Sequence, residues 1–432
     1  MLTAFIRAFK TPDLRKKLLF TLFIILIFRL GAQLPTPGVS VKAIKACTDI
    51  ANNGSQASVY QLVNLFSGGA LLKLSVFALG IMPYITASII LQLLTVVIPR
   101  LETLKKEGQS GTTKITQYTR YLTIGLAILQ STGIVAMAST GNLFQGCTTP
   151  LLYNTKIFTI VTMVVIMTAG TAVIMWLGEL VTDKGVGNGM SILIFTQVVA
   201  VFPQEFANIY TAKGGFAFTM VIVVGLAIVA GVVFVEQAQR RIPVQYAKRM
   251  VGRRMYGGTS TYIPLKVNQA GIIPVIFASS LMYLPALAAQ LFRNNKFLNQ
   301  TLAPYLQQDN AWHMAAFFGL IVFFTYFYVA ITFNPTEVAD NMKKYGGFIP
   351  GIRPGRPTAE YLDYVLTRIT TPGALYLGMI ALIPMIAFAL LKAGSQFPFG
   401  GTSILIVVGV GLDTVKQIES QLQQRNYEGF LR

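Results

Sequence analysis

GIMPYITAS, residues 80–88, returns 191 positions later in this chain as GIIPVIFAS, residues 271–279. Six of the nine positions are identical. A second echo, SILI, occurs at 191–194 and again at 403–406, each time after a pair of glycines. Two echoes in the same order and at a similar offset indicate an internal repeat rather than shared apolar composition. The sequence therefore predicts two related halves.

The composition is that of a membrane protein that crosses the bilayer many times. Of the 432 residues, 53% are hydrophobic and only 12% are charged, whereas roughly a quarter of the residues in soluble domains are charged. Ten apolar runs are long enough, or nearly so, for a spanning helix of about 20 residues. They lie at 18–31, 76–98, 121–140, 157–178, 189–203, 216–236, 271–292, 312–333, 373–392 and 397–412. We predict an all-α fold of ten transmembrane helices.

The distribution of the 35 basic residues predicts the orientation. If the ten segments alternate from a cytoplasmic N-terminus, most of these residues fall in inside regions, as the positive-inside rule requires. We therefore expect a multi-pass protein of the cytoplasmic membrane with both termini in the cytoplasm. Five helices per half, an odd number, make the second half enter from the opposite side, which predicts an inverted repeat. The halves are assigned to residues 1–212 and 213–432.

Residues 61–72 are apolar but too short to span a membrane. The glycine pair Gly68–Gly69 should end any helix that forms there. Irregular backbone cannot face lipid, so the segment either lies on the surface or folds back into the protein. We favour a short re-entrant plug helix, and a loop helix packed on the outer rim is the alternative.

The helices predicted at 76–98 and 271–292 carry matched prolines, Pro83 and Pro274, among small and hydroxyl residues. Such residues allow close approach between helices and supply interhelical hydrogen bonds worth about 0.6 kcal/mol each. Ordinary tolerance of a kink is the alternative explanation for the prolines. The runs at 189–203 and 397–412 are the shortest and begin at glycines, which points to a pathway at the repeat interface. The repeats match Ile85 to Ile276 and Ile194 to Ile406, so four aliphatic side chains should project toward one axis.

The largest polar segments are the predicted cytoplasmic loops 237–269 and 334–371. Alternating residues at 242–244 and 262–265 predict a hairpin of short strands in the first loop, and Gly–Pro turns should stiffen the tip of the second. Partner docking is a better explanation for these loops than a topology signal alone. The net charge of +19 favours an anionic partner such as lipid headgroups, nucleic acid or an acidic protein surface. The candidate docking residues are Arg240, Arg241, Lys248, Arg249, Arg253, Arg254, Lys343, Lys344, Arg353 and Arg356.

Several classes of chemistry are disfavoured by what the sequence lacks. No charged residue lies at the centre of any apolar run, which argues against ion-coupled transporters and proton relays. We find no motif for a nucleophile, a phosphate-binding loop or a metal site, and we expect no enzymatic activity, metal or cofactor. Cys47 and Cys147 both fall in predicted outside loops, where two free thiols are favoured over a disulfide. A secondary transporter of a small solute, and an enzyme acting on membrane lipids, are the competing hypotheses.

The chain resembles the SecY family, central subunits of the bacterial protein-conducting channel, over essentially its whole length. The resemblance rests on LPTPGV (34–39), NLFSGGAL (64–71), FALGIMPYITASIILQLL (77–94), KGVGNGMSILI (184–194), IPLKVNQAGIIPVIFASS (263–280), FNPTEVADNMKKYGGFIPGIRPG (333–355) and FGGTSILIVVGVGLD (399–413). It implies a channel that passes unfolded secretory polypeptides and releases apolar segments sideways into lipid. The outside segments 42–60 and 142–156 depart from the family pattern.

The resemblance also assigns roles to residues. It implies a plug over 61–72, including Asn64, Leu65, Phe66, Ser67, Gly68 and Gly69, and an aliphatic pore ring of Ile81, Ile85, Met190, Ile194, Ile276 and Ile406. A lateral gate would contain Pro83, Thr86, Ser88, Gln92, Gln130, Pro274, Ser279, Ser280 and Leu284. The two cytoplasmic loops would dock the SecA motor ATPase and the ribosome, with Arg353 the important arginine. Further implied partners are the small membrane subunits SecE and SecG, signal sequences, nascent polypeptides and lipids, without direct DNA binding.

Overall fold

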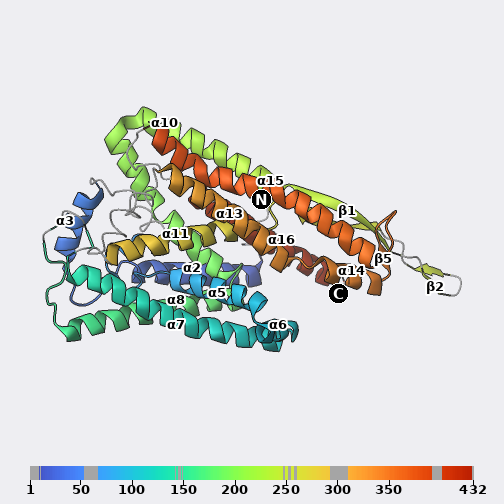
Figure 1. Cartoon of the computed structure of the whole chain (residues 1–432), viewed down its shortest axis with the longest axis horizontal. Coiled ribbons are helices and arrows are strands. Elements are labelled where there is room, and N and C mark those ends of the chain that lie inside the picture. Colours follow the sequence, from blue (N-terminus) through green and yellow to red (C-terminus); the bar gives the residue numbers. More distant parts are fainter. Residues whose placement is uncertain are drawn as a thin grey trace.

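A computed structural model describes residues 9, 11–52, 67–141, 143–144, 147, 149–246, 249–251, 254–256, 260–291, 310–391 and 401–430. The described chain is an elongated bundle of helices with a small sheet at one end (Figure 1). Side chains on the lipid-facing sides of the long helices are apolar and open. Phe158, Phe216 and Phe234, for example, are 82%, 83% and 78% exposed. Such a surface suits contact with hydrocarbon rather than water.

The helices follow the predicted apolar runs. Up to residue 199 the described helices are α2 (Pro12–Gly31), α3 (Val41–Asn52), α5 (Met82–Val97), α6 (Pro99–Lys106), α7 (Gln109–Ser139), α8 (Ile157–Lys184) and α9 (Gly189–Val199). After it they are α10 (Phe202–Gln237), α11 (Ile273–Leu291), α13 (Ala311–Thr332), α14 (Pro335–Lys344), α15 (Arg356–Leu391) and α16 (Gly401–Phe430). Among the described residues six helices are long and apolar enough to span a membrane, or seven if the bent pair α5–α6 is one span.

Helix ends differ from the predicted runs at three places. The run at 189–203 divides into α9, which ends at Val199, and the start of α10 at Phe202. The two pieces form one candidate span to Thr211, and Gly214, with φ 79°, then breaks α10. Helix α16 extends over 30 residues, well past its apolar run, so it is not short as the sequence suggested. Helix α15 begins at Arg356, and the predicted loop 334–371 is therefore largely helical. An apolar run marks the part of a helix that lies in the hydrocarbon of the membrane. The helix itself can continue into water until a capping residue or a glycine ends it.

The GI-x-P repeat gives the same local structure in both halves. Gly80 and Gly271 have φ values of +57° and +63°, a left-handed conformation that glycine adopts without strain. Two residues later α5 begins at Met82 and α11 begins at Ile273, and each has its proline at the second helical position. Proline is favoured in a first helical turn because its missing N–H has no partner there in any case. The prolines therefore start these helices and do not kink them.

The two predicted polar loops contribute strands to one sheet. Strand β1 (Gln239–Tyr246) pairs antiparallel with β4 (Ser260–Lys266), which places Ile242 opposite Ile263 and confirms the predicted hairpin. Strand β5 (Gly347–Phe348), from the second loop, pairs with the end of β1. Beyond them β2 (Arg249–Val251) pairs with β3 (Arg254–Tyr256) at the tip of the molecule (Figure 1). The two loops are thus joined in a single unit, which the sequence did not indicate.

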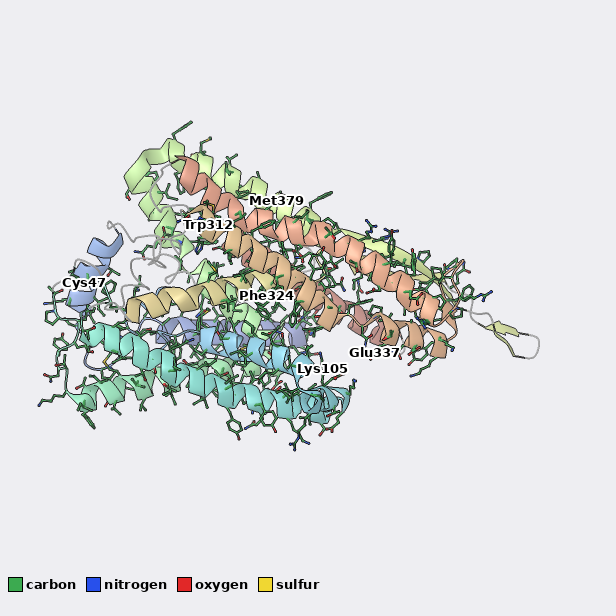
Figure 2. All side chains as sticks on the ribbon, viewed as in Figure 1. Cys47, Lys105, Trp312, Phe324, Glu337 and Met379 are labelled. Carbon is green, nitrogen blue, oxygen red and sulfur yellow. A yellow bond between two sulfur atoms is a disulfide. The ribbon has the colours of Figure 1, made fainter. Side chains whose placement is uncertain are left out.

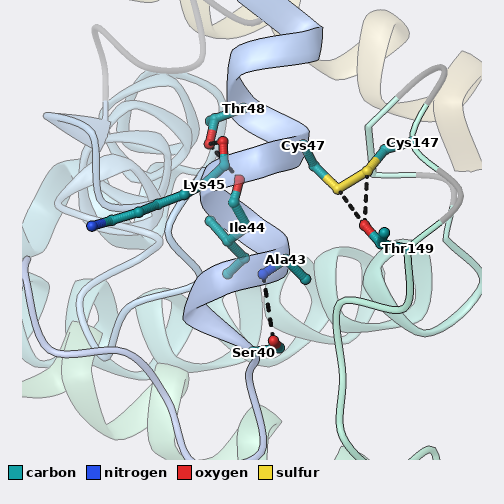
Figure 3. The surroundings of a disulfide bond; sticks show 8 residues. All are labelled: Ser40, Ala43, Ile44, Lys45, Cys47, Thr48, Cys147 and Thr149. Carbon is teal, nitrogen blue, oxygen red and sulfur yellow. Dashed lines mark hydrogen bonds between the residues drawn. A yellow bond between two sulfur atoms is a disulfide. The ribbon is translucent and has the colours of Figure 1, made fainter.

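A disulfide joins Cys47 and Cys147 at the opposite end of the molecule (Figure 3). The Cα atoms are 5.4 Å apart, within the range that a disulfide requires, and Thr149 Oγ1 lies 3.1 Å from each sulfur. The expectation of two free thiols is therefore wrong. Figure 2 shows Cys47 at one end of the long axis, with Lys105 and Glu337 toward the other.

Backbone hydrogen bonds bring the two cysteine segments together. Segment 34–40 bonds to the backbone on both sides, with Val76 N donating to Leu34 O at 2.9 Å and Ser40 N donating to Leu151 O at 2.9 Å. This long-range pairing has no signature in the local sequence, which is why the spacing of the cysteines alone left the pairing open.

Candidate functional site

The six residues assigned to the pore ring meet in one apolar cluster. They come from the segment before α5 and from α5, α9, α11 and α16, so elements of both halves contribute. Ile81, Ile276 and Ile406 are 1%, 5% and 0% exposed. A narrow space with no room for a water molecule, here called the ring cavity, is lined by Ile81, Met82, Ile85, Ile194, Gln197, Val198 and Ile276. The structure thus brings the predicted aliphatic side chains together, and it adds one polar residue, Gln197.

A larger cavity of about 470 Å³ lies beside the ring and is called the vestibule here. Its apolar wall includes Ile85, Ile276 and Phe277, and its polar wall includes Gln92 and Asn188. Met190 lines the vestibule rather than the ring cavity. The vestibule is therefore a wide, two-faced space that narrows to the ring.

An ion pair in the vestibule was missed at the sequence level. Arg120 of α7 donates from Nε and Nη2 to the two carboxylate oxygens of Glu179 of α8, each at 2.8 Å. Helix α8 continues through Glu179 to Lys184, so this carboxylate projects from a helix. A bidentate pair of this kind fixes the orientation of both side chains. It joins α7 and α8 at the wall of the vestibule.

The predicted seam lies between α5 and α11. Helix α5 packs extensively on α7 and α11 packs on α13, whereas α5 and α11 touch each other over a short stretch. The expected hydrogen bonds across the seam are not formed by its hydroxyl groups. Thr86 Oγ1 donates to Met82 O at 3.0 Å, and Ser279 Oγ donates to Ile276 O at 2.9 Å, each within its own helix. The seam between these described residues is held by apolar packing.

The other residues assigned to the gate have different surroundings. Pro83, Pro274 and Ser280 are buried, and Ser280 Oγ has no hydrogen-bond partner among the described residues. Ser88 and Gln92 line the vestibule from α5, and Gln130 is half-buried on α7. Leu284 belongs to α11, and its side chain lies outside the described part of the structure.

The part of the plug segment that the structure describes lies inside the protein. Ser67 and Ala70 are 3% and 1% exposed. Arg29 of α2 donates from Nη1 to the carbonyl of Gly68 at 3.1 Å. Gly68 and Gly69 both have positive φ, so the chain turns there as the glycine pair predicted. Asn64, Leu65 and Phe66 lie outside the described residues.

The candidate docking surface has a core of its own. Ile242, Val244 and Leu265 from the hairpin pack against residues of α14 and α15. Arg240, Arg241, Lys343, Lys344, Arg353 and Arg356 are exposed around this core. Arg249 and Arg254 lie on β2 and β3, where only the backbone is described, and Lys248 and Arg253 lie outside the described residues.

The base of the hairpin is tied to the start of α11 by a second feature that sequence analysis missed. Asn268 Nδ2 donates to Glu236 Oε1 at 2.6 Å and to the carbonyl of Gly271 at 3.1 Å. Glu236 and Asn268 are 9% and 3% exposed. The bond thus connects the end of α10, where the hairpin begins, with the glycine that precedes α11. A lone glutamate at the end of an apolar run gave no signal of this partner.

Comparison with known proteins identifies the family. The family model described as SecY matches residues 75–415. The protein translocase subunit SecY of Streptomyces scabiei is 67% identical over 446 residues, and that of Mycobacterium tuberculosis is 60% identical over 441 residues. Both alignments cover 100% of this chain and 100% of the relative.

The chain belongs to the SecY family.

Solved structures show the same fold for this SecY-family chain at low identity. A protein-conducting channel aligns with a TM-score of 0.64 at 18% identity, covering 94% of this chain and 92% of that one. A SecY structure described by its plug domain, which stabilises the closed state, aligns at 0.62 with 18% identity and the same coverage. Sec61 in a canine ribosome–channel complex aligns at 0.61 with 17% identity, again over 94% and 92%. The helical architecture described for the chain is therefore the fold of known protein-conducting channels.

Proposed function

We propose that this chain forms the pore through which unfolded secretory polypeptides cross the cytoplasmic membrane, with Ile81, Ile85, Met190, Ile194, Ile276 and Ile406 as its constriction. Membership of the SecY family makes the chain a protein translocase subunit and decides against the small-solute transporter. The observation that carries the proposal for these residues is the convergence of aliphatic side chains from both halves on one ring cavity. A solute transporter would need a polar site at that position.

An aliphatic ring suits a pore that must pass any sequence. Its side chains bind no particular residue, and a closed hydrophobic constriction excludes water and ions without a filter. The ring cavity is too narrow to hold a water molecule, so the described arrangement is closed. A passing polypeptide would push the two halves apart and displace the plug.

The seam between α5 and α11 is the proposed lateral gate. The seam is held by apolar packing rather than by interhelical hydrogen bonds. Opening of the seam therefore leaves the hydroxyl groups of Thr86 and Ser279 bonded within their own helices. A segment exposed to lipid is then sorted by its transfer free energy. A central Leu or Ile gains about 0.3 to 0.6 kcal/mol, whereas Arg or Asp costs about 2.5 to 3.5 kcal/mol. Apolar segments leave sideways and polar segments pass through.

The basic surface around the hairpin and Arg353 is the proposed docking site for the SecA motor and the ribosome. The shared core of the two loops supports this role, because it holds the exposed basic residues on a stiff support. The neighbour determined in a ribosome complex has the same fold. Two small membrane subunits, SecE and SecG, are the proposed companions of the chain in the bilayer.

Topology follows from the two ends of the molecule. The disulfide at one end belongs to an oxidising compartment, and the basic docking surface at the other end belongs to the cytoplasm. Figures 1 and 2 show these features at opposite ends of the long axis. We place both termini in the cytoplasm and the division of the halves between residues 212 and 213, close to the break at Gly214.

Cross-linking of an arrested substrate tests the proposal. Ile276→Cys, carrying a photoactivatable probe, should cross-link to a signal-bearing polypeptide stalled during SecA-driven transport into proteoliposomes. The matched control is Phe234→Cys, which is 78% exposed on the outside of α10. Equal cross-linking at the two positions would contradict the assignment of the pore. Because both native cysteines are in the disulfide, they do not compete for the probe.

A further inference from the structure

The ring cavity contains one polar side chain among its lining residues, that of Gln197. Gln197 lies on α9 three residues after Ile194, and side chains at this spacing share one face of a helix. It is only 2% exposed. An amide is therefore placed at the constriction, where the function derived above calls for aliphatic groups alone.

The amide nitrogen of Gln197 has no hydrogen-bond partner among the described residues. The ring cavity beside it is too narrow for a water molecule to take the place of a protein partner. A buried donor without an acceptor costs about 1 to 3 kcal/mol relative to the same group in water. The closed arrangement of the ring is weakened by this amount.

Two glycines lie against Gln197, Gly80 beside its side chain and Gly68 beside its backbone. A Cβ atom at Gly80 would overlap Gln197 Nε2 itself, so the amide lies directly against the backbone before Ile81. A Cβ atom at Gly68 would lie 3.2 Å from Gln197 Cα, and Gly68 belongs to the plug segment. The Gln197 amide thus lies between the backbone before α5 and the ring, while the Gln197 backbone lies against the plug segment. Separation of the ring residues would uncover the amide.

An opposing contact holds the plug in place. Arg29 donates a hydrogen bond to the carbonyl of Gly68, and a charged donor makes a stronger bond than a neutral one. Opening of the channel breaks this bond when the plug leaves, and it gives water access to the Gln197 amide when the ring separates. The two residues therefore act on the same equilibrium with opposite signs.

We propose that Gln197 is a positioning residue that sets the balance between the closed and open channel, because its unpartnered amide lowers the stability of the closed state while Arg29 raises it. The proposal rests on the channel function. An unpartnered donor that costs about 1 to 3 kcal/mol corresponds to a change in the closed-to-open ratio of about 5-fold to 150-fold.

Ion conductance of the reconstituted channel complex in planar bilayers, without substrate, measures this ratio. Gln197→Met keeps the length of the side chain and removes the donor, so the open fraction should fall by about fivefold or more. Gln197→Glu keeps the shape and adds a charge that is unfavourable in the closed cavity, so the open fraction should rise. Arg29→Met should also raise it. A role in packing alone would not give opposite signs for Met and Glu.

Gln421→Met is the matched control, because the side-chain oxygen of Gln421 on α16 is also buried and has no partner in the described part of the chain, and Gln421 does not line the ring cavity. It should leave the open fraction unchanged. If thermal unfolding shows that Gln197→Met is not accommodated, Gln197→Leu replaces it. An open fraction that stays the same or rises in the folded apolar variant overturns the inference. Failure of the wild-type complex to conduct when given a signal-bearing substrate would instead contradict the channel function.

Discussion

Removal of the Cys47–Cys147 disulfide should lower the free energy of unfolding by about 2 to 4 kcal/mol. The bond closes a loop with a sequence separation of 100 residues. In the chain-entropy description a loop of this length restricts the unfolded state by about 4.7 kcal/mol when every residue is flexible. Helices α5, α6 and α7 account for 16, 8 and 31 of the enclosed residues. In a detergent-unfolded state these helices persist, and the value falls to about 4 kcal/mol.

Titration of purified protein from mild detergent into sodium dodecyl sulfate, followed by the fluorescence of its two tryptophans, measures this difference. The double variant Cys47→Ser/Cys147→Ser and the reduced wild type should unfold at the same, lower detergent fraction. Reductant should have no effect on the double variant. Thr149→Ala is the control that removes the hydroxyl near both sulfurs and leaves the bond intact. A shift below about 0.5 kcal/mol on reduction would refute the argument that the bond restricts the unfolded chain.

Four further outcomes are expected. A membrane-impermeant reductant applied to intact cells should reduce the disulfide, so that an impermeant thiol reagent then labels Cys47 and Cys147. If these thiols are labelled only after the cells are lysed, the outside placement of α3 is contradicted. Arg353→Glu should abolish SecA-driven transport without lowering thermal stability, because the side chain is exposed, whereas normal transport would remove the loop from the docking site. A short cross-linker between Ile89→Cys and Phe277→Cys, which line the vestibule from α5 and α11, should block translocation, and full activity of the locked form would remove the gate from that seam. Asn268→Leu should destabilise the folded protein by about 1 to 3 kcal/mol, because it removes the hydrogen-bond donor of the buried Glu236 carboxylate. An unfolding midpoint equal to that of the wild type would contradict this prediction and show that water replaces the amide.

The predicted apolar runs and the hairpin needed no tertiary information. A run of apolar residues indicates a segment that lies in the hydrocarbon of the membrane. Alternation of apolar and polar residues at 242–244 and 262–265 indicates half-buried strands. The same reasoning missed the helical start of α15 at Arg356, because polar residues are accepted in a helix that has left the membrane. It also expected Thr86 and Ser279 to bond across the seam. Each hydroxyl instead donates to a carbonyl of its own helix, a local option always available to these residues.

The repeat of GIMPYITAS and GIIPVIFAS by itself determined that two helices begin in the same way, with a left-handed glycine and a proline in the first turn. It also paired Ile85 with Ile276, because equivalent positions in two halves face a common axis. Only the tertiary structure brought Gln197 into the ring, joined Glu236 to Asn268 and bonded Cys47 to Cys147. These contacts join residues far apart in the chain. Local sequence encodes periodicity and backbone conformation, but it does not encode which distant surfaces meet.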